Sequence, residues 1–77
     1  MITTDEGRAT RAKGMKIDFA GDDYLVHDPK KKKGYLVKKG VNGYQCPCGD
    51  KFKASYISCK HIVAVAMLED VKIKVLK

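Results

Sequence analysis

The sequence predicts a small α+β fold in which an antiparallel hairpin or meander of three to five short strands packs on one C-terminal helix. Short segments of alternating apolar and polar residues are separated by turns that contain glycine and aspartate, as expected for strands. A continuous apolar segment at 62–68 predicts the helix. With 77 residues the chain forms one small domain, and a core of this size seldom supplies more than ~3–5 kcal/mol. We therefore expect an additional stabilising device.

The N-terminal residues differ in character from the rest of the chain. Residues 1–14 show no apolar period and offer few groups for burial, so they cannot offset the entropy lost on ordering. We expect a flexible tail over 1–14 and a single domain over 15–77. Strict alternation begins with Met15, Ile17 and Phe19 on one side, which predicts a half-buried first strand.

Three more strand segments precede the helix. Residues 24–27 form a β-rich run, and 35–37 begin a third strand after a loop that contains four lysines. The Asn-Gly pair at 42–43 predicts a tight hairpin, because both central residues of a type I′ turn need positive φ. The chain returns through a fourth strand segment at 44–48. Pro47 has no amide hydrogen, so this end of the strand lies at an edge or outside the sheet.

The helix is expected over residues 60–69, although several of its residues are β-branched and favour helix only weakly. Ser55 or Ser58 is a candidate N-cap. Apolar residues cover most of the helix circumference, so the helix is either covered on both sides by strands or leaves an apolar strip for a partner. Residues 71–77 alternate again and predict a final strand.

All three cysteines and one of the two histidines lie within sixteen residues. One residue separates Cys46 from Cys48, ten residues follow, and one residue separates Cys59 from His61. Three thiolates and one imidazole form a donor set of structural zinc sites, so we expect one Zn²⁺. Strand alternation places the first pair on one face. The second pair must straddle a helix start, with Cys59 in the preceding turn and His61 in the first turn, because residues two apart on a helix diverge by ~200°.

Other interpretations of these residues are open. Cys46 and Cys48 are a candidate redox dithiol, although a disulfide between such near neighbours is strained and leaves Cys59 over. Cys59 and His61 are a candidate nucleophile and base, but no third orienting group is visible. His27 is the rival nitrogen ligand. Four protein ligands would fill a zinc coordination sphere, so we do not expect an enzyme.

The pattern Cys-x-Cys, a short spacer, and Cys-x-His before an apolar helix resembles the SWIM zinc finger. The segment 59–65, Cys-Lys-His-Ile-Val-Ala-Val, is close to that family's typical Cys-Lys-His-Ile-Leu-Ala-Val. Residues 35–37 and Tyr44 stand where the family places the β-hairpin that leads to the first ligand pair. The likeness covers roughly 24–68. It implies a ββα-like zinc module that binds DNA or proteins, with the same four residues as ligands.

The net charge of +7 is concentrated around the cysteines. Residues 28–60 carry a net +7, whereas 1–27 carry −1 and 61–77 carry +1. Such a field favours a polyanionic partner, and the alternative is that the lysines only keep a small domain soluble. The lysines expected to contact nucleic acid are Lys30, Lys31, Lys32, Lys33, Lys38, Lys39, Lys51, Lys53 and Lys60.

We expect nucleic acid, with DNA favoured, as the partner of this surface. Lysines contact mainly phosphate, and no cluster of Arg, Asn or Gln is present to read bases. The alternative partner is a protein or a second copy of the chain, docked on the apolar helix at 62–68. Tyr24, Tyr35, Tyr44 and Tyr56 are candidates either for base stacking or for core and rim positions. No apolar run approaches the ~20 residues of a membrane span, so we expect no membrane partner. Three cysteines cannot all pair with one another, so a secreted disulfide scaffold fits poorly and we expect an intracellular protein of the cytoplasm, nucleoid or nucleus.

Overall fold

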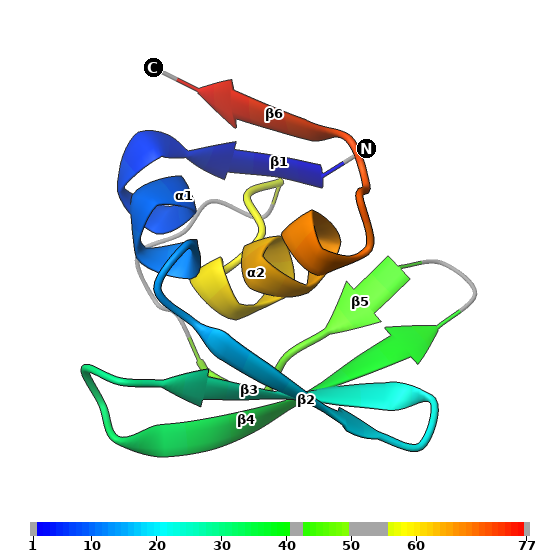
Figure 1. The fold of residues 1–77 in the computed structure, drawn as a ribbon. Coiled ribbons are helices and arrows are strands. Elements are labelled where there is room, and N and C mark those ends of the chain that lie inside the picture. Colours follow the sequence, from blue (N-terminus) through cyan, green and yellow to red (C-terminus); the bar gives the residue numbers. More distant parts are fainter. Residues whose placement is uncertain (1, 41–42, 50–55, 77) are drawn as a thin grey trace.

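The computed structural model describes residues 2–40, 43–49 and 56–76. Three layers are stacked: a two-stranded sheet, a pair of helices and a four-stranded sheet (Figure 1). In chain order the elements of the described residues are β1 (Ile2–Asp5), α1 (Glu6–Ala12), β2 (Lys16–Ala20), β3 (Asp23–Asp28), β4 (Lys33–Gly40), β5 (Gly43–Gln45), α2 (Lys60–Leu68) and β6 (Ile73–Leu76). The predicted α+β class, with an antiparallel meander and a C-terminal helix, is confirmed.

The larger sheet is a meander in the order β2-β3-β4-β5, with every neighbouring pair antiparallel. Along β3, the side chains of Tyr24, Val26 and Asp28 are buried toward α2, while the residues between them are more exposed. Met15, Ile17 and Phe19 were predicted to point inward from β2. The prediction is confirmed for Ile17, which packs on the core. It is wrong for Phe19, which is 75% exposed. This residue lies on an edge strand close to the β2–β3 turn, where its ring centroid is 5.7 Å from that of Tyr24.

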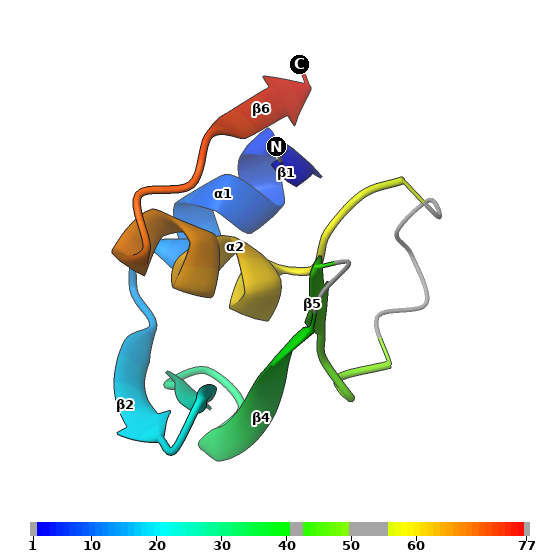
Figure 2. The same ribbon diagram turned by 90° about the vertical axis from the view of Figure 1, so that its right-hand side faces the viewer.

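Helix α2 lies between the two sheets (Figure 2). Val63, Val65 and Ala66 are completely buried. The β-branched residues that weaken helix propensity therefore stabilise this helix by packing, and burial of each valine contributes ~1.5–3 kcal/mol. Of the two expected environments for this helix, coverage on both sides is the one found for residues 61–66.

The structure corrects the prediction for the N-terminal residues. The segment 1–14 was expected to be a flexible tail, but residues 2–12 form β1 and α1 and pack on the domain. Parallel pairing of β1 with β6 aligns Ile2 with Ile73, and the Thr4 hydroxyl donates to the carbonyl of Ser58 at 3.1 Å. These partners lie more than fifty residues away in the sequence, so local periodicity carries no sign of them. The packed structure therefore begins before residue 15.

Glu69 ties the C-terminal end of α2 to the larger sheet. Its carboxylate accepts hydrogen bonds from the Tyr24 hydroxyl at 2.5 Å, the Tyr44 hydroxyl and Lys39 Nζ at 2.9 Å. These three hydrogen bonds, with that of Tyr24 the largest cause, lower the pKa of Glu69 to about 2. The helix stops because Asp70 adopts the left-handed conformation, with φ +59. One carboxylate thus connects α2 with β3, β4 and β5.

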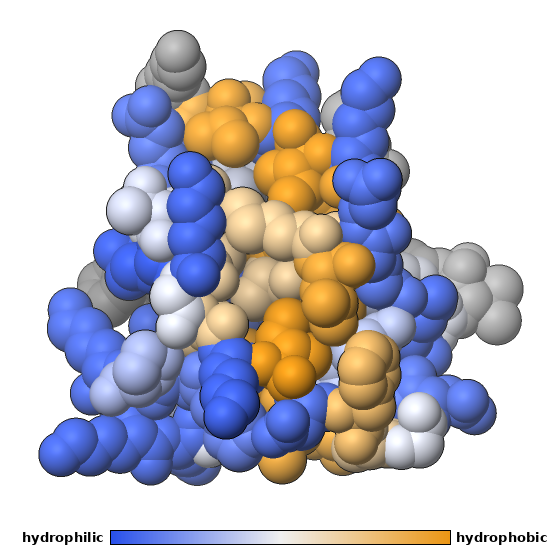
Figure 3. All heavy atoms as spheres, in the orientation of Figure 1, coloured by the Kyte–Doolittle hydropathy of each residue, from blue (hydrophilic) through white to orange (hydrophobic). Residues whose placement is uncertain are grey.

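One face of the molecule exposes apolar side chains. In Figure 3 they gather over β2, α2 and the strands β1 and β6, with hydrophilic side chains around them. Ala12, Met15, Ile17, Met67 and Leu68 line a groove of about 300 Å³ between β2 and the two helices. No helix in the described part of the chain combines the length and the apolar character needed to cross a membrane.

Candidate metal centre

The four predicted ligand residues converge at one point between β5 and α2. The ligand atoms of Cys46, Cys48, Cys59 and His61 all lie within 4.8 Å of one another. Strand β5 ends at Gln45, so the first two cysteines lie on a turn that has left the sheet, one of the two positions that Pro47 allows. Cys59 is the extended residue directly before α2, and His61 is in its first turn. The positions of Cys59 and His61 agree with the spacing argument. The strand expected over 44–48 is wrong beyond residue 45, so the first pair converges from a turn and not by strand alternation.

The separation between Cys46 and His61 matches a shared metal ion. Cys46 Sγ lies 3.5 Å from His61 Nδ1. Zinc bonds of about 2.3 Å to sulfur and 2.0–2.1 Å to nitrogen, at a tetrahedral angle, put these two atoms about 3.6 Å apart. A shared ion would therefore be bound by Nδ1 of His61, whose Nε2 contacts Asp28 instead of the cysteines.

Asp28 holds that second nitrogen, and sequence reasoning missed it. His61 Nε2 lies 3.1 Å from Asp28 Oδ2, and both residues are at most 1% exposed. A carboxylate on the far nitrogen of a metal-binding histidine fixes the tautomer and the ring orientation. In the sequence Asp28 precedes Pro29 and resembles an ordinary turn residue. The available signal was its alternation with Tyr24 and Val26, which puts its side chain on the buried face of β3.

The same carboxylate also anchors the lysine-rich turn. Asp28 Oδ2 accepts from Lys60 Nζ at 3.0 Å, while Oδ1 accepts from the backbone amides of Lys30 at 3.0 Å and Lys31 at 3.3 Å. Burial raises the pKa of Asp28, but the hydrogen bonds from Lys60 and His61 outweigh it, and the pKa falls to about 2. Asp28 is thus a buried anion that links a candidate ligand to the turn between β3 and β4.

Tyr35 closes the site on another side. Its ring stacks on the His61 imidazole at a centroid distance of 4.2 Å and an interplanar angle of 27°. Tyr35 is itself 7% exposed, so the imidazole is enclosed by an aromatic face and a carboxylate. Lys33 Nζ lies 5.4 Å from the centroid of the same ring, on the side of the lysine-rich turn.

The thiols differ in their readiness to ionise. The hydrogen bond from Cys46, followed by those from His61 and the Ile62 backbone amide, lowers the pKa of the Cys59 thiol. The hydrogen bond to Cys59, together with burial, raises the pKa of the Cys46 thiol. Of these two thiols, Cys59, at the positive end of the α2 dipole, therefore ionises more readily.

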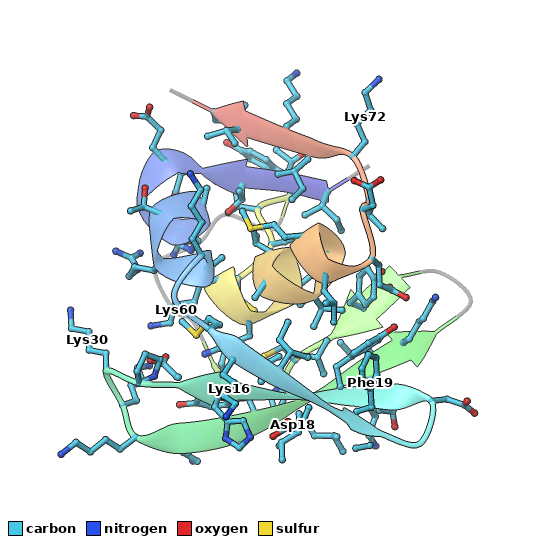
Figure 4. The ribbon with its side chains drawn as sticks, viewed as in Figure 1. Lys16, Asp18, Phe19, Lys30, Lys60 and Lys72 are labelled. Atoms are coloured by element: carbon cyan, nitrogen blue, oxygen red, sulfur yellow. The ribbon has the colours of Figure 1, made fainter. Side chains whose placement is uncertain are left out.

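The predicted lysines fall into three groups. Lys30, Lys31, Lys32, Lys33 and Lys38 are exposed. Lys39 is paired with Glu69, and the Lys60 side chain is only 14% exposed and is paired with Asp28. Lys51 and Lys53 lie outside the described residues. Figure 4 shows Lys30 and Lys60 toward the end of the larger sheet where β3 joins β4, with Lys16 at the start of β2.

The structure also gives the positions of His27, the alternative nitrogen ligand, and of the tyrosines considered for base stacking. His27 alternates with Asp28, so it lies on the outer face of the sheet, where its Nε2 is 2.9 Å from Asp18 Oδ2. It is therefore not part of the cluster. Tyr24 and Tyr35 are buried, whereas Tyr56 is 66% exposed. Core positions are thus found for the first two of the tyrosines considered for base stacking.

Searches for similar proteins returned no matching family model, no matching curated protein and no matching solved structure. Function is therefore argued from the site itself. Its four donors can hold one metal ion, and they are the donor types that suit zinc. Such an ion would join the end of β5 to the start of α2.

Proposed function

We propose that this chain is a small, non-enzymatic zinc-binding module of the SWIM type that binds nucleic acid, with DNA favoured, through its lysine-rich surface. The observation that carries the metal assignment is the convergence of three thiols and one imidazole within 4.8 Å, with Asp28 behind the imidazole. Resident zinc would supply four-coordinate cross-linking of the chain. The cysteines of the described residues form no disulfide that could stabilise the fold in its place, because all of them are free thiols.

A structural role for zinc follows from the number of ligands and from their positions. Three cysteines and one histidine leave a tetrahedral ion no open position for a substrate or water. The ligands come from a turn after β5 and from the start of α2, segments that are otherwise joined through 50–58. Glu69 fixes the other end of α2, so the metal and this carboxylate hold the helix at both ends.

Nucleic-acid binding is supported by the distribution of charge. The net +7 over 28–60 lies largely on exposed lysines of the β3–β4 turn and β4. Asp28 orders that turn by accepting from two of its amides, so the lysines extend from a fixed backbone. Lysine acts as a point charge toward phosphate, which predicts affinity with little sequence preference.

The test is the salt dependence of binding to a random-sequence DNA duplex by the zinc-loaded chain. Binding should weaken ~10-fold or more between about 50 and 200 mM salt. It should be lost when Lys30, Lys31, Lys32 and Lys33 are all changed to alanine. A chain that binds neither DNA nor RNA at low salt would refute this function while leaving the metal site untouched.

The second candidate function is a protein-interaction adaptor, and the apolar groove favours it. Docking on the apolar helix at 62–68 was the alternative to coverage by the domain's own strands, and residues 62–66 are buried within the domain. What remains is the groove in which Met67 and Leu68 of α2 face Met15 and Ile17. Salt-insensitive self-association that is lost in Met67→Asp would support this alternative.

A further inference from the structure

A pocket lies at the end of the larger sheet, between the start of β2 and the β3–β4 turn. It has a volume of about 330 Å³. Its lining includes Lys16, His27, Lys32, Lys33 and Gly34. It is separate from the cysteine cluster, although Asp28 both lines the pocket and contacts His61 of the cluster.

The electrostatics of this pocket favour an anion. Three of its lining residues are lysines, and among residues 2–40, 43–49 and 56–76 no ion pair involves Lys16 or Lys32. The carboxylate in the lining, Asp28, is already bonded to Lys60, His61 and two backbone amides. Positive charge in the pocket is therefore in excess.

The backbone shapes the pocket before any ligand arrives. Asp28 Oδ1 holds the amides of the turn, and Lys32 follows in the left-handed conformation with φ +52. Gly34 pairs with His27 in the sheet. A Cβ at this glycine would lie 3.7 Å from His27 Nδ1 and 3.2 Å from Leu25 Cδ1. A side chain at this position would therefore crowd Leu25 and lie against His27, which lines the pocket.

We propose that this pocket binds a phosphate group, with Lys16 and Lys32 as the principal contacts. The two ammonium groups come from different elements, β2 and the turn, so they can approach one phosphate from two sides. The phosphate belongs either to a nucleic-acid backbone or to a free phosphate compound. The first source rests on the proposed function, and the second does not.

The experiment compares two double variants of equal charge in the zinc-loaded full chain. Lys16→Ala with Lys32→Ala removes the pocket lysines, and Lys72→Ala with Lys74→Ala removes two exposed lysines near β6, in the opposite layer. The pocket variant should weaken binding to a random DNA duplex at least 10-fold and lower the salt slope by about two. The control should change the affinity less than 3-fold.

Gly34→Ala tests shape without changing charge. The added methyl group would crowd Leu25 and lie against His27 in the pocket lining, so DNA binding should weaken while the metal content stays at one ion per chain. A second arm titrates inorganic phosphate and follows the amide resonances of Lys33 and Gly34, which should shift in the parent chain and stay still in the Lys16→Ala, Lys32→Ala variant.

The outcomes separate this proposal from the proposed function. Phosphate shifts without any DNA binding would support the pocket as a site for a free phosphate compound and refute nucleic-acid binding. DNA binding that falls equally in both double variants, with no phosphate shifts, would overturn the pocket and leave nucleic-acid binding intact. Absence of both signals would overturn both.

Discussion

Replacing Asp28 by asparagine should lower the affinity for zinc about 10- to 100-fold, the usual effect of losing a carboxylate behind a metal-binding histidine. Asp28 Oδ2 accepts from both His61 Nε2 and Lys60 Nζ, and Oδ1 accepts from two amides of the turn. If the side-chain oxygen of the asparagine still accepts from the two amides of the turn, its NH₂ group lies opposite His61 Nε2 and Lys60 Nζ. Both of these groups are donors, so their hydrogen bonds are lost. Each lost hydrogen bond to a charged group is worth about 1.5–3 kcal/mol.

The assay is competition for zinc against a chromophoric chelator, with the cobalt absorption spectrum as a check that the ligand set is unchanged. Asp18→Asn is the matched control, because Asp18 makes the same kind of contact with a histidine, His27, on the outer face of the sheet. Its zinc affinity should equal that of the parent chain. If Asp28→Asn binds zinc within 3-fold of the parent, or if Asp18→Asn loses as much, the assigned role of Asp28 is wrong.

Three further predictions concern the ligands and the carboxylate at the far end of α2. Cys59→Ser should leave the chain unfolded at neutral pH, seen as loss of near-UV and far-UV circular dichroism, because metal binding is also folding free energy. His61→Ala should abolish the cobalt–thiolate absorption, whereas His27→Ala should retain it; equal spectra would contradict the ligand assignment. Burial and the hydrogen bond to Glu69 raise the pKa of Tyr44 to about 12. The folded chain then keeps a proton that the unfolded chain releases near pH 10, so stability should fall between about pH 10 and 12. Tyr44→Phe should remove the last phenolate step of an ultraviolet titration, and an unchanged step would refute the assignment.

The meander and the ligand cluster were predictable because their signals are local. Strand alternation, turn residues and the spacing of four donors each depend on residues close in sequence. The positions of Cys59 and His61 followed from helix geometry alone, since two ligands separated by one residue diverge on a helix. The structure confirms both the class of fold and the convergence of the donors.

The first and last parts of the chain were not predictable in the same way. β1 is only four residues long, and it is a strand because β6, some seventy residues later, pairs with it. The role of Asp28 was hard to predict for the same reason. An aspartate before proline is common in turns, and its contact with the imidazole of His61 joins residues far apart in the sequence. Phe19 shows the opposite error, because the alternation predicted an inward side chain but its side chain is 75% exposed at the end of an edge strand.

Native mass spectrometry of the purified chain, paired with circular dichroism before and after a chelator, tests the metal centre most directly. One zinc ion per chain should be found, and its removal should unfold the domain. A chain that keeps its fold after complete loss of metal would contradict the structural role. A mass lower by two hydrogens, with no metal, would instead identify a disulfide among Cys46, Cys48 and Cys59.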